Sequence, residues 1–245
     1  MGAPINNNRE VLFSQEERIL DQSMLEYLGG TCINDARLAQ EATMVERVPR
    51  YSNGEKENIA EHAYMMSLVA MELVPALNKD RQDKDKLDIG LVLQFITVHD
   101  LVEIETKNGD TSTFAITETG LKEKAEEEAA AMVRLRPRLG SVNRDIVNRY
   151  EEQKEPEAVF VRKFDKIMPV LVELISEGQT TRALVEEEGV RSVDQFKRHD
   201  QANRTRMAAI KGFSELDEIR EFLGDKYTRE FARELATVLA DLRVA

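Results

Sequence analysis

The chain has 245 residues, of which 42% are apolar and 33% charged, as in a globular protein with room for a sizeable core. A net charge of −12 disfavours nucleic-acid polymers and anionic membranes as partners, but not a small phosphorylated substrate. No apolar run approaches the roughly 18 residues that cross a bilayer, and the N-terminus lacks a signal-peptide pattern. The single cysteine, Cys32, excludes an internal disulfide framework, so we expect a cytoplasmic protein.

The pattern is helical almost throughout. Glycine and proline are few (12 and 6), and no segment alternates apolar and polar residues over a strand's length. Ser14 and Glu17 have the spacing of a capping box and predict a first helix that stops at Gly29–Gly30. A second helix is expected over about Asn34–Glu46.

A loop is expected next, through Val48–Pro49 and the polar stretch Ser52–Lys56. Asn58 and Glu61 then have the spacing of another capping pair and predict the start of a helix. The apolar residues of that helix recur at intervals of three and four and form one buried stripe: Ile59, Ala63, Met66, Ala70, Leu73 and Leu77.

Beyond a charged connection at residues 78–86, the next helix carries an apolar face and runs into His99–Asp100. Asn108–Gly109 is a turn signal. The later helices are predicted at about Thr117–Arg136, Ser141–Gln153, Pro156–Glu177, Val193–Lys211 and Leu216–Leu242. The fold class is therefore all-α.

Four residues on these helices form a candidate metal-ligand set. His62 lies at the edge of its buried stripe, and His99 and Asp100 lean toward the interior. Asp165 falls in an apolar row of a later helix, where an unpaired carboxylate is costly. Two imidazoles and two carboxylates suit Mn, Fe, Co, Ni or Zn. A buried His–Asp network without a metal is the alternative interpretation.

Two further carboxylates are candidates for chemistry. Glu103 lies four residues after His99, which on a continuous helix puts both on one face. A carboxylate beside a metal-activated water can act as general acid or base, whereas the plainer expectation is an exposed helix glutamate. That plainer expectation fits Glu105 better. Asp110 is either a turn residue, which the local sequence favours, or a polar contact at the mouth of the site.

Two other features are predicted to be structural. His199–Asp200 is a second His-Asp pair, but it lies in a polar stretch and is expected at the surface. Cys32 has no sequence partner that marks it as a nucleophile, and we expect it to be a small buried residue.

The order His62, His99–Asp100, Asp165 resembles the H…HD…D pattern of the HD-domain phosphohydrolases. The surrounding segments are similar to those of the bacterial HD-domain 5′-deoxynucleotidases and their eukaryotic relatives. These segments are Glu57–His62, Val98–Glu103, Gly109–Asp110 and Phe160–Lys166. The resemblance covers about Ala36–Ser176.

This resemblance implies a single HD-domain helical bundle over residues 1–245, with a core at 36–176 and additional C-terminal helices at 177–245. It also implies a homodimer that hydrolyses nucleoside 5′-monophosphates, preferably deoxyribonucleotides. His62, His99, Asp100 and Asp165 would hold one divalent metal, either a transition metal (Mn, Co, Fe, Ni or Zn) or Mg.

The other site residues are carried over in the same way. Glu103 would be the acid/base group and Arg47 would hold the phosphate, while Asp110 would position the sugar or the attacking water. The family often has tryptophan directly after this arginine, where this chain has Val48. The departure bears on recognition of the base, and not on the metal.

Four alternatives stay open. HD folds also include nucleoside triphosphate triphosphohydrolases and two-iron oxygenases, and the second class would need more ligands than three histidines readily supply. A phosphatase of a non-nucleotide metabolite is a third possibility. The fourth, from another class, is a non-catalytic helical binding module with an HD core.

Overall fold

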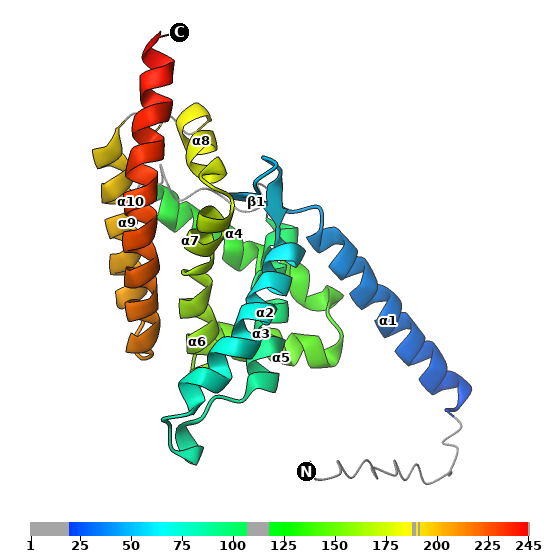
Figure 1. The fold of residues 1–245 in the computed structure, drawn as a ribbon. Coiled ribbons are helices and arrows are strands. Elements are labelled where there is room, and N and C mark those ends of the chain that lie inside the picture. Colours follow the sequence, from blue (N-terminus) through cyan, green and yellow to red (C-terminus); the bar gives the residue numbers. More distant parts are fainter. Residues whose placement is uncertain (1–19, 107–117, 188–189, 191, 245) are drawn as a thin grey trace, which may run out of the picture.

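The computed structural model describes residues 20–106, 118–187, 190 and 192–244. Apart from one two-stranded hairpin, the described elements are helices, which confirms the all-α class (Figure 1). In chain order they are α1 (Gln22–Ala42), β1 (Glu46–Arg50), β2 (Lys56–Asn58), α2 (Ile59–Asn78), η1 (Asp83–Asp85), α3 (Ile89–Val98), η2 (Leu101–Glu105), α4 (Glu118–Leu135), η3 (Arg136–Arg138), α5 (Ser141–Glu152), α6 (Pro156–Asp165), α7 (Met168–Ile175), α8 (Gln179–Glu186), α9 (Val193–Ala208) and α10 (Ser214–Val244). Among the described residues, no helix combines the length and apolar composition needed to cross a membrane.

The hydrophobic core surrounds α3, which contacts α2, α5 and α6. Its inward residues Val92, Phe95 and Ile96 are fully buried and belong to the main cluster. The stripe predicted on α2 contributes Met66 and Ala70, also fully buried. The sequence pattern therefore located the main core correctly, because a 3.6-residue apolar period defines which face a helix must bury.

The predicted helix stop at Gly29–Gly30 is wrong, since α1 passes through both glycines without a break. Neither glycine has the positive φ that a left-handed helix cap requires. The described helix begins at Gln22 and is capped by Asp21, whose side chain accepts a hydrogen bond from the Met24 backbone N–H at 2.8 Å. The predicted start at Ser14 lies outside the described residues. Cys32, expected to be buried, is exposed on this helix.

The loop predicted around residues 48–56 is correct only in its middle. Val48–Pro49 lies in β1, which pairs with β2 as an antiparallel hairpin, and residues 51–55 form the turn between the strands. Pro49 is tolerated because this sheet has only two strands, so both are edge strands. Gly54 takes φ 84° in the connecting turn, a conformation that favours glycine. Side chains alternate along β1, and Arg47 and Pro49 are buried.

The single helix predicted over Pro156–Glu177 is divided into α6 and α7. Pro169, near the start of α7, has no backbone N–H, and its ring would clash with the carbonyl of Asp165 in a continuous helix. The break therefore makes Asp165 the last residue of α6. α8, which follows Gly178, was not predicted.

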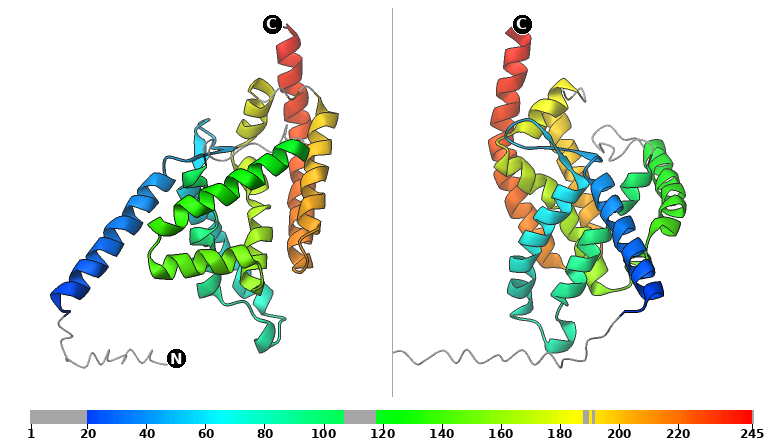
Figure 2. Two further views of the ribbon diagram at one scale, coloured as in Figure 1. Left: turned by 180° about the vertical axis from the view of Figure 1, so that it is seen from behind. Right: turned by 90° about the vertical axis from the view of Figure 1, so that its right-hand side faces the viewer.

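α9 and α10 pack side by side along one flank of the bundle (Figure 2). The prediction that His199–Asp200 lies at the surface is wrong. Asp200 is 8% exposed and accepts hydrogen bonds from Arg204 of α9 and Arg220 of α10. His199 is partly buried, and burial, followed by the nearby Arg206, lowers its pKa to about 4. Asp200 therefore links α9 to α10, and neither residue of the pair lies in the group formed by His62, His99, Asp100 and Asp165.

A buried lysine joins this flank to the core. Lys163 of α6 is 1% exposed, and its Nζ donates to the carbonyl oxygens of Ile210 and Gly212 and to Asp217. These acceptors lie in and beside the α9–α10 turn. The C-terminal helices are therefore attached to the same helix that carries Asp165.

Gly224 of α10 is buried against the Asp200 ion pairs, and a Cβ there would overlap Arg220 Nη1 and Arg204 Nη2. We expect Gly224→Ala to displace both guanidinium groups from Asp200 and to cost about 1–3 kcal/mol in the free energy of unfolding, measured by urea denaturation. Gly30→Ala is the matched control, since a Cβ there meets nothing within 4 Å. Alanine is the better helix former, so Gly30→Ala should be neutral or stabilising by up to about 1 kcal/mol. A loss of stability confined to Gly30→Ala would contradict this account.

Candidate metal centre

Three helix ends bring the four predicted ligands together. His62 lies in the first turn of α2, His99 and Asp100 directly follow α3, and Asp165 ends α6. The capping box of Asn58 and Glu61 is present in the structure and sets the first turn of α2. Because the helix ends meet at one place, residues up to 103 positions apart in the sequence become neighbours.

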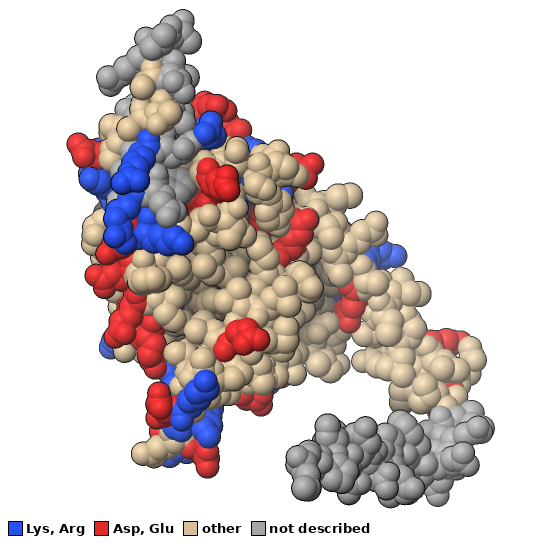
Figure 3. All heavy atoms as spheres, viewed as in Figure 1, with Lys and Arg blue, Asp and Glu red and all other residues tan. Residues whose placement is uncertain are grey.

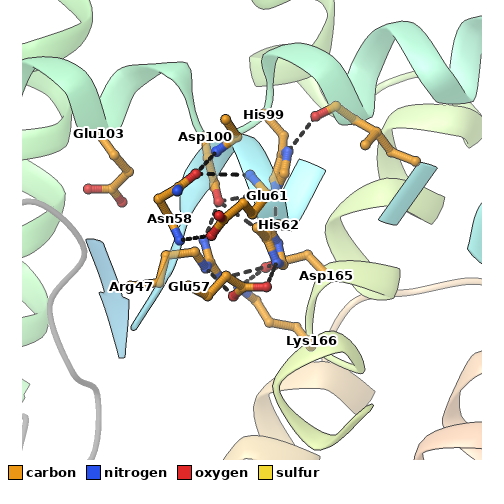
Figure 4. Close-up of polar contacts among 12 residues, drawn as sticks. Arg47, Glu57, Asn58, Glu61, His62, His99, Asp100, Glu103, Asp165 and Lys166 are labelled. Atoms are coloured by element: carbon orange, nitrogen blue, oxygen red, sulfur yellow. Dashed lines mark hydrogen bonds and ion pairs between the residues drawn. The ribbon is translucent and has the colours of Figure 1, made fainter. Parts of the chain in front are cut away.

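The ligand cluster, as we call His62, His99, Asp100 and Asp165, offers one ligand atom per residue, and these atoms all lie within 4.8 Å of one another. His62 Nε2 is 3.0 Å from Asp165 Oδ1. His99 Nε2 is 3.2 Å from Asp100 Oδ2 and 4.0 Å from Asp165 Oδ1. Figure 4 shows the four side chains pointing toward one another. Both histidines are buried, at 0% and 6% exposure.

The proton on His99 can be placed from its partners. Nδ1 is 2.8 Å from the Ile96 carbonyl oxygen, which only accepts, so Nδ1 carries the proton. In the neutral ring Nε2 is then a lone pair, and it has no hydrogen bond among the described residues. This lone pair and the Asp100 carboxylate face each other at 3.2 Å. Two electron-pair donors held so close are stabilised by a shared cation, either a proton or a metal ion. The full set of two imidazole nitrogens and two carboxylates is one that fits a divalent metal.

Positive charge from other side chains surrounds the two carboxylates. Arg47 Nη1 pairs with Asp100, and Nη2 lies 3.7 Å from Asp165 Oδ1. Lys166 Nζ donates to Asp165 Oδ2 at 2.7 Å. The arginine is therefore beside the ligand cluster, where the family resemblance predicted a phosphate-binding residue.

These charges shift the titration of the cluster. Burial raises the pKa of Asp165, but Lys166, His62 and Arg47 outweigh it and hold that pKa well below its usual range. Burial and Arg47 lower the pKa of His62, yet the contacts with Asp165 and Glu57 raise it on balance to about 9. A metal ligand must be a neutral imidazole, so metal binding at His62 has to displace a proton.

Sequence reasoning missed Glu57, which is 0% exposed and lies between Arg47 and His62. In the sequence, Glu57 stood out only as the first residue of the segment Glu57–His62, which is similar to the family, and no role was assigned to it. Sequence reasoning also missed Lys166, which ends the similar segment Phe160–Lys166 and directly follows Asp165. Glu57 could have been found from its place before the Asn58 cap, had the hairpin been recognised.

Glu103 is buried, at 7% exposure, but it does not lie on a helix face shared with His99, as its spacing had suggested. α3 ends at Val98, and Glu103 lies in the short 3-10 turn η2, so it does not share a helix face with His99. Thr106 Oγ1 donates to its carboxylate at 3.2 Å. In Figure 4 it stands apart from the dashed contacts of the ligand cluster.

Glu105 was expected to be exposed but is partly buried and forms ion pairs with Arg138 and Arg134. Arg138 also binds Glu41 of α1 at 2.6 Å, so η2 is held between α1 and the end of α4. Asp110 lies outside the described residues, and its role stays a prediction.

Helices α7 and α8 support the strand that carries Arg47. α7 and α8 both contact β1. Thr180 Oγ1 of α8 accepts a hydrogen bond from the Arg50 backbone N–H at 2.9 Å, and Arg50 Nη2 binds Glu187 at 2.6 Å. In turn, buried Glu173 of α7 accepts from the backbone N–H groups of Thr180 and Thr181. This chain of contacts positions β1, and with it Arg47.

Comparison with known families agrees with this architecture. The family model of the HD domain matches residues 43–218, which is more than half of the sequence. The chain therefore belongs to the HD domain family. The match starts after Ala36 and ends beyond Ser176, the bounds expected for the core.

One solved structure is similar over most of its length. It is described as a predicted metal-dependent phosphohydrolase from Magnetospirillum magnetotacticum MS-1. The TM-score is 0.62 at 22% sequence identity, and the similarity covers 85% of this chain and 98% of the other. At that identity the likeness concerns the fold. No curated protein matches the chain.

Removing any one ligand should remove the metal. For His62→Ala, Asp100→Asn and Asp165→Asn we expect the affinity for Mn²⁺ to fall more than about 100-fold, since loss of an outer partner alone costs roughly 10–100-fold. Isothermal titration calorimetry after chelator treatment measures this. His199→Gln is the control, because that histidine lies on α9 and not in the cluster. Unchanged Mn²⁺ affinity in folded Asp165→Asn would show that the cluster is not a metal site.

Proposed function

We propose that this chain is a divalent-metal-dependent phosphohydrolase that removes phosphate from a small phosphate ester. The substrate class we propose is the nucleoside 5′-monophosphates, deoxyribonucleotides in particular. The observation that carries the proposal is the convergence of two imidazole nitrogens and two carboxylates within 4.8 Å, with the Arg47 guanidinium beside them. The description of the similar solved structure as a predicted metal-dependent phosphohydrolase points the same way.

A metal bound by the ligand cluster would polarise a phosphoryl oxygen and lower the pKa of a water molecule. Arg47 supplies a planar pair of N–H donors that matches two phosphate oxygens, and its place beside Asp100 and Asp165 puts it next to any phosphate held at the cluster. Lys166 adds a second positive charge there. Together they neutralise the phosphate locally, although the whole chain carries −12.

Glu103 is the group we assign to proton transfer. Hydrolysis of a phosphate monoester adds water across the P–O bond, so one proton leaves the water and one reaches the leaving oxygen. Glu103 is a buried carboxylate at the end of the segment that carries His99 and Asp100. Such a group can take the proton from water or give it to the departing alcohol.

The charge distribution supports a small substrate over a polymer. On the face drawn in Figure 3, Lys and Arg side chains occur in separate small groups with acidic side chains among them. Binding of a nucleic-acid polymer requires a continuous basic surface that contacts several phosphates. One phosphate at the ligand cluster needs only the charges already described.

The substrate class is tested by phosphate release from ribo- and deoxyribonucleoside mono- and triphosphates, in Mn²⁺, Co²⁺ and Mg²⁺, after chelator treatment. We expect release from monophosphates that returns only when metal is added. The control is the same preparation carrying Asp165→Asn.

The other outcomes have definite meanings. Tripolyphosphate or pyrophosphate as product would place the chain among triphosphohydrolases. No release from any nucleotide by a metal-loaded protein would rule out the nucleotidase assignment. Metabolite phosphate esters would then be the next panel.

Glu103→Gln should keep the size of the side chain at position 103 and remove the carboxyl group that transfers protons. We expect kcat to fall by roughly 10²–10⁴-fold, while Mn²⁺ affinity stays within threefold of wild type. Glu157→Gln is the matched control: it too is a buried glutamate, but at the far end of α6, where Oε1 accepts from the Asp88 backbone N–H. If Glu103→Gln lost the metal instead of rate, Glu103 would be a ligand and the role assigned here would be wrong.

A further inference from the structure

We propose that Glu57 is a positioning residue whose one buried carboxylate couples the metal ligand His62 to Arg47. The part that concerns Arg47 rests on the proposed function, in which that arginine binds phosphate. The part that concerns His62 rests on the geometry of the ligand cluster alone.

The hairpin places Glu57 between these two residues. Glu46 pairs with Asn58 and Arg50 with Lys56, with an irregularity in the register between them, so Arg47 of β1 and Glu57 of β2 lie on facing stretches of the hairpin and both are buried. Oε2 of Glu57 lies 3.2 Å from Arg47 Nε. Because α2 begins two residues after Glu57, the first turn of that helix brings His62 to the other oxygen. Oε1 lies 3.5 Å from His62 Nδ1.

Burial makes this arrangement necessary. The Glu57 side chain is 1% exposed, so its charge has almost no contact with water. Neither of its oxygens, nor His62 Nδ1, has a hydrogen bond to any other group in the described part of the chain. A buried carboxylate without a counter-charge is strongly unfavourable. The guanidinium and the imidazole are the groups placed to supply that charge.

The two contacts have different consequences. An N–H at His62 Nδ1 facing Glu57 leaves Nε2 for the ligand cluster, and a carboxylate on the far side of a ligating histidine sets its tautomer and raises its basicity. For Arg47, pairing of Nε with Glu57 uses the one nitrogen of the fork that points backward. Nη1 and Nη2 then face the cluster, beside Asp100 and Asp165. The single carboxylate of Glu57 thus orients both the metal ligand His62 and the arginine proposed to bind phosphate.

Glu57→Gln tests this without changing shape. Its partners both present N–H donors, and an amide has one acceptor oxygen, so the NH₂ group must face one of them. We expect Mn²⁺ affinity to fall about 10–100-fold and KM for the best substrate of the panel to rise several-fold, with a smaller change in kcat. Glu157→Gln, which also alters a buried carboxylate of the core, should leave Mn²⁺ affinity and KM unchanged.

A double-mutant comparison separates the two halves of the proposal. In an Arg47→Ala background, Glu57→Gln should no longer raise KM, because the residue through which it acts is gone. Its effect on Mn²⁺ affinity should persist in that background, because it acts through His62. If Glu57 served only the stability of the fold, Glu57→Gln would lower the urea midpoint of unfolding without changing Mn²⁺ affinity or KM in the folded protein.

Several results would overturn the proposal. Wild-type Mn²⁺ affinity in folded Glu57→Gln removes the coupling to His62, whatever the activity. A rise in KM that survives in the Arg47→Ala background removes the coupling to Arg47. If Glu57→Gln does not fold, Glu57→Asp replaces it, since the shorter side chain cannot span both partners. Wild-type Mn²⁺ affinity and KM in Glu57→Asp would overturn the proposal in the same way. No phosphate release by the wild type, combined with weakened Mn²⁺ binding in Glu57→Gln, would reject the proposed function and keep the His62 coupling.

Discussion

Burial of negative charge is the constraint around which this structure is arranged. Glu57, Asp165 and Asp100 bring three carboxylates to one end of the helical bundle, where Glu57 is fully buried and the other two side chains are only 13% and 20% exposed. Arg47 is in contact with all three, and Lys166 and His62 complete the balance of charge. Such a cluster is costly to assemble in a low-dielectric interior unless every charge has a partner. The desolvation cost is consistent with a site whose carboxylates must stay ionised in order to bind a cation.

The elements around the cluster follow from that requirement. Arg47 can reach the carboxylates only because a short hairpin carries it over the helix ends, and the hairpin is too small to be stable by itself. α7 and α8 pack against its first strand, and the C-terminal pair α9–α10 is held to α6 through Lys163. Helices α7 to α10 are thus connected, through β1 and α6, to the site where Arg47 is proposed to hold phosphate.

Much of the fold could be predicted from the chain, and each failure has a local cause. The predicted cap of α2 is present, and α4 and α5 begin and end within one residue of their predicted bounds. The glycines at 29 and 30 suggested a stop, yet a glycine ends a helix only where the backbone turns to positive φ, and here it does not. The hairpin was missed because β2 has three residues, too few for alternation to be visible. Pro169 divides the segment 156–177, which had been predicted as one continuous helix.

The sequence by itself determined which residue types are available and which face of each helix is buried. That was enough to select His62, His99, Asp100 and Asp165 as candidates, because polar residues on apolar faces require an explanation. Only the tertiary structure decided that their ligand atoms meet, that Glu57 stands behind both His62 and Arg47, and that Glu103 occupies a 3-10 turn. These facts depend on where helices end and how strands pair. Both are set by contacts between distant segments, which local periodicity does not encode.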